Sequence, residues 1–155
     1  MKDAFGGIFN FVFIVLFLLI VSGILAFIVS YTKAFKMKNY IISSIENFEG
    51  RENCFSAAPT GGNSCSSIIS DKAKSIGYTP VINNCPTGYN LAGNGLFCYC
   101  PLKKNYSGEV ECDSGNLDRR EKYRVIAQID INIPIVRDIL SFSFFRVSGD
   151  TKYMN

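Results

Sequence analysis

The sequence predicts an α+β protein. In this fold a long N-terminal transmembrane helix continues as an amphipathic stalk, which packs on a small antiparallel β-sheet with a disulfide-rich loop region. Three observations predict this class: an uncharged apolar stretch, a helical pattern that continues past it, and strand-like alternation combined with six cysteines near the carboxyl end. The 155 residues suit one small domain with an attachment. We divide the chain into a short leader or tail (1–7), a transmembrane helix (8–31), an amphipathic stalk helix (32–50) and a disulfide-stabilised extracytoplasmic domain (51–155).

The first of these features is a membrane segment. Of the 24 residues in 8–31, 18 are Ile, Leu, Val or Phe, and no charged side chain occurs between Ala4 and Thr32. At about 1.5 Å per residue the segment reaches roughly 36 Å, which is enough to cross a bilayer with some tilt. A cleaved signal has a shorter apolar core and a small-residue exit. A buried helix of a soluble protein would need a larger core around it. We therefore expect an uncut anchor.

The helical pattern continues beyond the membrane segment. Apolar residues recur at steps of three and four, which is typical of an amphipathic helix. They are Ala34, Met37, Ile41, Ile45 and Phe48, and the opposite polar face carries Lys36, Lys38, Asn39, Ser43, Glu46 and Asn47. Gly50 is a natural stop, so one helix is expected from about Phe9 to Glu49. The alternative is a break near Thr32 that separates a membrane helix from a surface helix.

The orientation of the anchor receives conflicting signals. Lys33, Lys36 and Lys38 follow the apolar segment, and on the positive-inside bias they would place the carboxyl side in the cytoplasm. All six cysteines lie beyond residue 50, an even number in a domain of about 105 residues, which indicates an oxidising compartment. We favour a single-pass membrane protein whose carboxyl-terminal domain lies outside.

Short elements separated by turns are expected in the domain itself. Residues 51–64 and 79–95 are rich in Gly, Pro and Asn and predict loops. A helix is expected over 66–76 and is closed by Gly77. Strands are expected over 96–100, 109–112, 123–133 and 140–147. In the third of these strands Tyr123, Val125, Ala127 and Ile129 alternate with polar residues, which predicts one buried face, and Pro134 ends it. Gly149-Asp150 begins a polar tail.

The cysteines are best interpreted as structural disulfides. They are Cys54, Cys65, Cys85, Cys98, Cys100 and Cys112, with no C-x-x-C pair and no histidine. A zinc site or a thiol-disulfide catalyst is therefore disfavoured. Cys98 and Cys100 lie two apart on an expected strand, so they face the same side and each would bond a different partner. Fifteen connectivities remain possible.

Composition excludes most enzyme designs. The chain has no His, which removes Ser-His-Asp and Cys-His catalysis and the H-E-x-x-H zinc helix. A net charge of +3 is divided between the two parts of the chain and does not indicate nucleic-acid binding. No spacing of acids, Ser or Lys predicts a catalytic pair. We expect no cofactor, no metal, no nucleic acid and no small-molecule substrate.

A resemblance to a known family adds to this interpretation. Tyr31, Ala34, Asn39 and Ile42 occur within SYTKAFKMKNYIISSIENFEG, and the chain closes with IPIV followed by FFRVSGDTKYM. With the long amino-terminal helix, these motifs make the chain resemble the type IV pilin superfamily, and more narrowly the pilin-like proteins of tight-adherence pilus systems. They cover about 50 of the 155 residues. The cysteine-rich middle has no counterpart in that pattern.

The resemblance implies a non-enzymatic structural subunit of a bacterial surface appendage or its assembly machinery. Its partners would be the lipid bilayer and other pilin-like subunits, which would contact the helix at its small residues Ser22, Gly23 and Ala26. A prepilin carries a Glu five residues into the mature chain, whereas a cut after Gly7 would place Val12 there. An anchored minor subunit therefore fits better than a processed major one. The alternative is a monomeric anchored binding module that uses the loops around 79–95.

Overall fold

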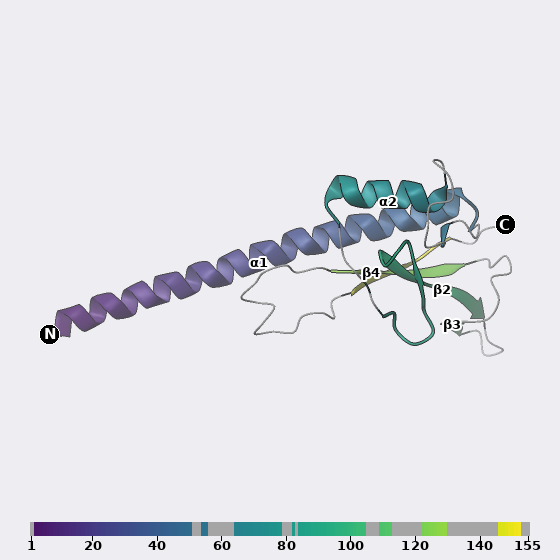
Figure 1. Cartoon of the computed structure of the whole chain (residues 1–155). Coiled ribbons are helices and arrows are strands. Elements are labelled where there is room, and N and C mark those ends of the chain that lie inside the picture. Colours follow the sequence, from purple (N-terminus) through teal and green to yellow (C-terminus); the bar gives the residue numbers. More distant parts are fainter. Residues whose placement is uncertain are drawn as a thin grey trace.

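The computed structural model has a long helix that projects from a small α+β head (Figure 1). The structure describes residues 2–50, 54–55, 64–78, 82, 84–104, 109–112, 122–129 and 146–152, with side chains omitted at 2–6 and 104. Within these residues the order of elements is α1, α2 and then five strands, β1 to β5. The predicted fold class is confirmed.

Helix α1 runs without a break over Lys2–Asn47, so the alternative with an interruption near Thr32 is wrong. Its end is built as expected: Gly50 adopts a left-handed conformation with φ of 62°, and its N–H donates to the carbonyl oxygen of Ile45 over 2.9 Å. Ala34, Met37, Ile41 and Ile45 have no exposed surface. The second half of α1 is therefore a core element of the head, and the stalk is not a separate surface helix.

Helix α2 covers Cys65–Ile76 and lies beside the second half of α1 (Figure 1). Ser64 caps its start, because its side chain accepts a hydrogen bond from the N–H of Ser67 over 3.3 Å. Gly77 ends it in the left-handed conformation, as the sequence predicts. Ile69 and Ala73 point into the core next to α1. The short helix thus covers one flank of the long one.

The sheet is antiparallel, and its main path has the order β1-β2-β4-β5, with β3 paired to the far end of β2. The strands are β1 (Asn90–Ala92), β2 (Phe97–Lys104), β3 (Val110–Cys112), β4 (Tyr123–Gln128) and β5 (Arg146–Asp150). The segment 79–95, expected to be loop throughout, therefore contains a strand. Three residues are too few for a periodicity signal, and β1 is defined by its pairing with β2, in which Leu91 lies opposite Cys98.

Pro101 explains why β2 changes partner along one edge. Neighbouring residues of a strand direct their N–H groups to opposite edges, and the N–H of Leu102 donates to Lys122 beside β4 over 2.9 Å. The missing N–H of Pro101 therefore faces the other edge. There β1 pairs only as far as Tyr99, and β3 begins opposite Leu102. A proline is tolerated here because no ladder bond is required at that point.

The second face of the sheet is partly covered, in contrast to the single buried face expected for β4. Phe97, Tyr99, Val125 and Val147 face α1 and join the main core. On the opposite face, Ile126 is buried with Ile82 and Cys98, and Cys85 and Tyr89 pack against this second cluster. The alternation in the sequence is real, but the segment around Ile82 and Cys85 folds over the face that was expected to be open.

The last strand differs from its predicted position. Strand β5 extends to Asp150, whereas Gly149 and Asp150 were expected to lie beyond the strand; residues 140–145 and 130–133 of the expected strands lie outside the described residues. Gly149 pairs with Val125, and a Cβ built on Gly149 would lie 2.9 Å from Cδ1 of Ile42 and 3.1 Å from Cδ of Lys38. The glycine is there because strand and helix approach each other closely, and not because the chain turns.

Lys38 is a second correction. It was assigned to the polar face, but only 9% of it is exposed, because its stem lies beside Gly149. Its Nζ is 4.3 Å from the centroid of the Phe35 ring. A lysine can be buried in this way because its apolar stem packs while its charged end reaches the edge of the core.

Truncating a buried apolar side chain of α1 should lower the stability of the head. We expect Ile41→Ala to lower the free energy of unfolding by about 2–5 kcal/mol, since it leaves a cavity between α1 and the sheet. The matched control is Ile24→Ala on the exposed half of the same helix, which should leave the head unchanged. Urea unfolding of the full chain in detergent, followed by tyrosine near-UV circular dichroism, measures both. Equal effects of the two changes would contradict the packing described here.

A side chain at Gly149 should separate β5 from α1. We expect Gly149→Val to destabilise the head by about 1–3 kcal/mol, because the added atoms overlap Ile42 and Lys38. Ser148→Val is the control: it adds a similar side chain one residue earlier, on the exposed face, where a β-branched residue is favourable. Melting temperatures of the two variants should therefore move apart, and a Gly149→Val protein as stable as the control would refute the close approach.

Candidate functional site

The most distinctive surface of the molecule is the first half of α1. Its apolar side chains from Ile8 to Val29 are mostly exposed, and none of the most apolar 18-residue window is buried (Figure 1). By length and composition this helix is able to cross a membrane. Water would not support so large an apolar surface on a monomer. The surface therefore requires a cover, of which lipid is the simplest.

A row of aromatic side chains marks the end of the exposed stretch. Phe27, Tyr31 and Phe35 stack along one side of α1 with 6.3 Å between successive ring centroids. Lys38 lies over the last ring, so the row ends in a buried cation. Aromatic side chains of this kind are typical of the boundary between hydrocarbon and headgroups. The boundary expected near Tyr31 thus coincides with the point at which α1 enters the head.

Helix α2 brings further lysines to this boundary. It runs antiparallel to α1, because Lys33 Nζ lies 3.4 Å from the carbonyl oxygen of Gly77 while Lys72 Nζ lies 5.4 Å from the Tyr40 ring centroid. Lys74 is one turn before Gly77 and makes an exposed ion pair with Asp71 at 3.8 Å. A cation at the last carbonyls of a helix interacts favourably with its dipole. Lys33 therefore fastens the end of α2 to the base of the head.

The residues predicted for helix packing fall into two groups. Met37, Ile41 and Ile45 are fully buried in the core of their own chain. Ser22 and Gly23, by contrast, lie on the exposed half with Ala26, and a Cβ at Gly23 would meet no atom within 4 Å. The Ser22 hydroxyl donates to Leu19 O over 2.9 Å, so it is satisfied within the helix. The first group is intramolecular, and the second is open to a neighbour.

All six cysteines are paired in three disulfides, and none is free. The pairs are Cys54–Cys65, Cys85–Cys98 and Cys100–Cys112. Cys98 and Cys100 bond different partners, as the strand geometry predicted. The first bridge joins the turn after α1 to the start of α2, the second joins the loop at Cys85 to β2, and the third joins β2 to β3. Each closes a short loop, and such a bridge stabilises a small domain by about 2–4 kcal/mol.

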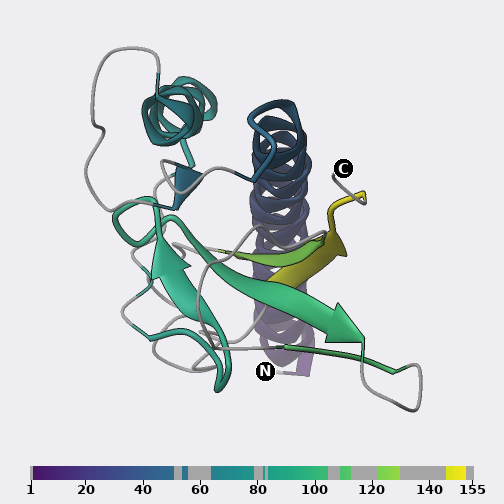
Figure 2. The ribbon, with the colours of Figure 1, turned by 90° about the vertical axis from the view of Figure 1, so that its right-hand side faces the viewer.

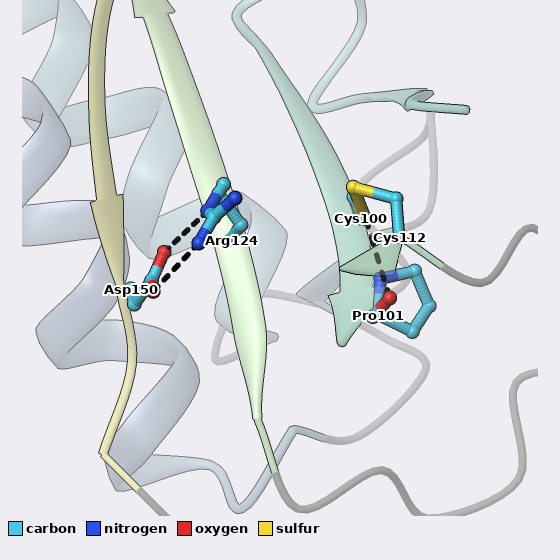
Figure 3. Close-up of a disulfide and its surroundings, with 5 residues drawn as sticks. All are labelled: Cys100, Pro101, Cys112, Arg124 and Asp150. Atoms are coloured by element: carbon cyan, nitrogen blue, oxygen red, sulfur yellow. Dashed lines mark hydrogen bonds and ion pairs between the residues drawn. A yellow bond between two sulfur atoms is a disulfide. The ribbon is translucent and has the colours of Figure 1, made fainter. Parts of the chain in front are cut away.

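The outer side of the sheet carries an ion-pair cluster (Figure 3). Arg124 on β4 holds Asp150 on β5 in a two-pronged contact, with Nε 2.7 Å from Oδ1 and Nη2 3.1 Å from Oδ2. Lys122 adds a contact of 3.7 Å. Cys100 Sγ lies 3.2 Å from Pro101 O nearby, a close contact and not a hydrogen bond, because a disulfide sulfur bears no proton.

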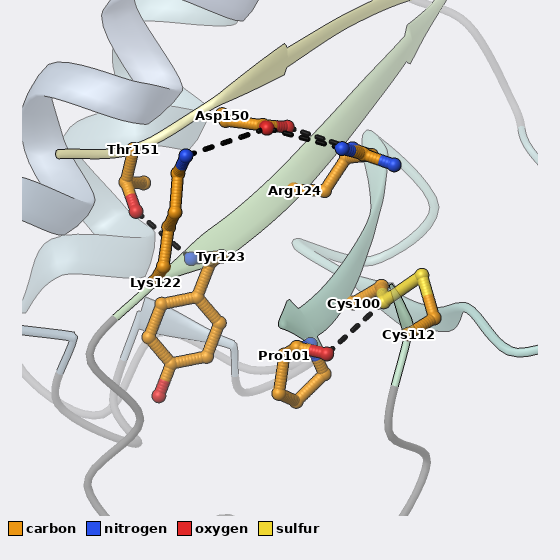
Figure 4. A network of polar contacts seen from close by, with 8 residues as sticks. All are labelled: Cys100, Pro101, Cys112, Lys122, Tyr123, Arg124, Asp150 and Thr151. Carbon is orange, nitrogen blue, oxygen red and sulfur yellow. Dashed lines mark hydrogen bonds and ion pairs between the residues drawn. A yellow bond between two sulfur atoms is a disulfide. The ribbon is translucent and has the colours of Figure 1, made fainter. Parts of the chain in front are cut away.

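The same cluster fixes the end of β5 (Figure 4). Thr151 is buried, its Oγ1 accepts from the N–H of Tyr123 over 2.9 Å, and its own N–H donates to Tyr123 O over 2.8 Å. Hydrogen bonding from Arg124, and secondarily its charge, lowers the pKa of Asp150, and the hydrogen bond to Asp150 raises the pKa of Arg124. Both groups stay ionised, and the cluster stabilises the pairing of β4 with β5.

Nothing in this arrangement recommends a chemical reaction. Among the described residues, no three His, Cys, Asp or Glu side chains are grouped so that they would hold a metal ion. The Lys33 contact with Gly77, the buried Thr151 and the Gly149 approach escaped sequence reasoning. Each depends on tertiary proximity, although a glycine inside an expected strand end was an available signal. In comparisons with family models, curated proteins and solved structures, no match is found.

Proposed function

We propose that this chain is a non-enzymatic, membrane-anchored, pilin-like structural subunit of a bacterial surface appendage or of its assembly machinery. One observation carries the proposal: a single helix is core to the head in its second half and is apolar and mostly exposed in its first. A subunit of this shape is held in lipid by the first half and can pass into a bundle of like helices without refolding. The sequence motifs at 30–50, 133–136 and 144–154 add the family resemblance.

A cleaved signal sequence is the other interpretation of an apolar helix near the amino end. The continuity of α1 weighs against it, because Ala34 is buried only three residues beyond Tyr31 and the helix has no turn or extended segment between them. Removal of the apolar half would also leave the aromatic row of Phe27, Tyr31 and Phe35 without its first ring. An anchor that stays attached fits this continuity better.

Lateral packing would use the small residues of the exposed half. Gly23 and Ile41 are 18 residues apart, which is five helical turns, so they share one face of α1. From Ala34 onward that face is occupied by the chain's own sheet. A second copy that packs at Gly23 and Ala26 must therefore be displaced along the helix axis, with its helix beneath the first head. A staggered arrangement of this kind extends into a filament and not a closed dimer.

Sidedness is the first test of the proposal. Treatment of intact cells with a membrane-impermeant maleimide should label the chain only after reduction, because all six cysteines are bonded, and the half-buried Cys85 and Cys112 should react first. Two added thiols serve as controls without reduction: Ser43→Cys should react on intact cells, and Lys2→Cys only after lysis. The reverse pattern would place the head in the cytoplasm and overturn the proposal.

Self-association through the helix is the second test. We expect the full chain to form oligomers in mild detergent, and Gly23→Leu to weaken this association by about tenfold, because its side chain holds the helices apart. Gly23→Ala is the control, since it also replaces glycine in a helix but remains small. Light scattering during size-exclusion chromatography measures both variants. A monomeric wild-type chain would instead favour an anchored binding module that uses the loops around 79–95.

A further inference from the structure

Four of the described lysines lie at the base of the head. Lys33 and Lys36 on α1 and Lys72 and Lys74 on α2, here called the basic patch, have Asp71 as their acidic neighbour. The chain has 16 basic and 13 acidic residues, so without the patch and Asp71 it retains twelve of each. These five residues together carry a formal charge of +3 and lie on α1 and α2 between the levels of Lys33 and Tyr40.

The fold, and not the sequence order, assembles this patch. Lys33 and Lys72 are far apart along the chain, but antiparallel packing places Gly77 at Lys33 and Lys72 at Tyr40. On a helical wheel Lys33, Lys36 and Tyr40 share the flank of α1 that α2 covers. The lysines therefore lie on one side of α1, the side on which α2 packs. Figure 2 shows the ribbon of α2 beside that of α1.

The height of the patch matches the headgroup layer. If the hydrocarbon ends near Tyr31, Lys33 and Lys36 lie about 3 and 8 Å beyond it along the helix. Lys74 lies one turn from the Lys33 contact, and Lys72 is beside Tyr40, about 14 Å beyond Tyr31. Most of the patch falls within one Debye length of the surface, about 10 Å at 0.1 M salt.

We propose that the basic patch binds the phosphate groups of anionic lipids and so docks the base of the head on the membrane surface. This inference rests on the proposed anchoring of α1 and adds a lipid class to it. An ammonium has three donors, and the contact of Lys33 with Gly77 O uses one of them, so phosphate oxygens remain within its capacity. Lys36 is exposed, and Lys74 makes only an exposed pair with Asp71, a weak competitor for a phosphate.

The consequence of docking is a fixed orientation of the head. The aromatic row of Phe27, Tyr31 and Phe35 lies on another side of α1 from the patch, and it is suited to the apolar edge of the interface. Lysines on one flank and aromatic rings on another determine which side of a tilted helix faces the membrane surface. Because α1 is one continuous helix, a head oriented in this way also gives the Gly23 face of every subunit the same tilt relative to the membrane surface.

The test measures lipid selectivity on the full chain. The protein is purified in detergent, exposed to mixed micelles with equal amounts of dioleoyl phosphatidylglycerol and phosphatidylcholine, and the retained lipids are counted by native mass spectrometry. We expect the wild-type chain to retain phosphatidylglycerol in preference to phosphatidylcholine. The patch variant carries Lys36→Gln and Lys74→Gln, and each substitution should lower this preference about fivefold, because one lysine near an anionic surface strengthens lipid binding by about that factor. Neither side chain contacts the core.

The control is Lys103→Gln with Lys152→Gln, which removes the same charge at exposed positions. The N–H of Lys152 donates to Glu46, ten residues beyond Lys36 on α1, so this position lies well above the surface. An unchanged preference in the patch variant, or an equal loss in the control, overturns the inference. Displacement of phosphatidylglycerol by millimolar inorganic phosphate also overturns it, because the patch would then be a general anion site.

Carbonate extraction of the same variants from vesicles separates this inference from the proposed function. A wild-type chain that resists extraction but retains both lipids equally contradicts only the basic patch. A chain that carbonate removes from the vesicles contradicts the membrane anchor, and the proposal for the patch falls with it. Resistance to extraction together with a selectivity that the patch variant loses supports both.

Discussion

The contact between the second half of α1 and the sheet is the interaction on which the rest of the structure depends. Met37, Ile41 and Ile45 have no exposed surface, and they pack with the side chains of β4 and β5 that face the helix. Burial of three such side chains contributes several kcal/mol, a large share of the stability of a head this small. Because the same helix continues into the exposed half, anything that orients this half also orients the head.

Sequence reasoning succeeded where one periodic signal was sufficient. The apolar face of α1, the end of α2 at Gly77 and the alternation around Val125 each result from local geometry. The sequence predicts all three. Sequence reasoning failed where tertiary contacts decide. Lys38 was expected in solvent and Gly149 in a tail, but the two lie against each other because β5 crosses α1 closely. The pairing of the cysteines likewise depended on which loops fold over β2, which spacing does not encode.

Two contacts hold the two ends of α2. The Cys54–Cys65 bridge ties the start of α2 to the turn after α1, and Lys33 holds the last carbonyl of α2 near the base. The contact at the start of α2 is covalent and the contact at its end is electrostatic, so the two respond to different conditions. Reduction breaks the disulfide, and high salt weakens the lysine contact. The position of α2, and with it the proposed lipid contact, is therefore sensitive to the environment at both ends.

The lysines beside the membrane and the cysteines of the head gave opposite indications of sidedness, and the structure changes their relative weight. Lys38 lies against Gly149 and Lys33 contacts Gly77, so two of the three lysines that follow the apolar segment have roles in the folded head. Their presence is accounted for without a cytoplasmic location. The three disulfides have no comparable alternative explanation, because in a reducing compartment all six sulfurs would be thiols. An outside head satisfies both sets of residues, whereas an inside head explains only the lysines.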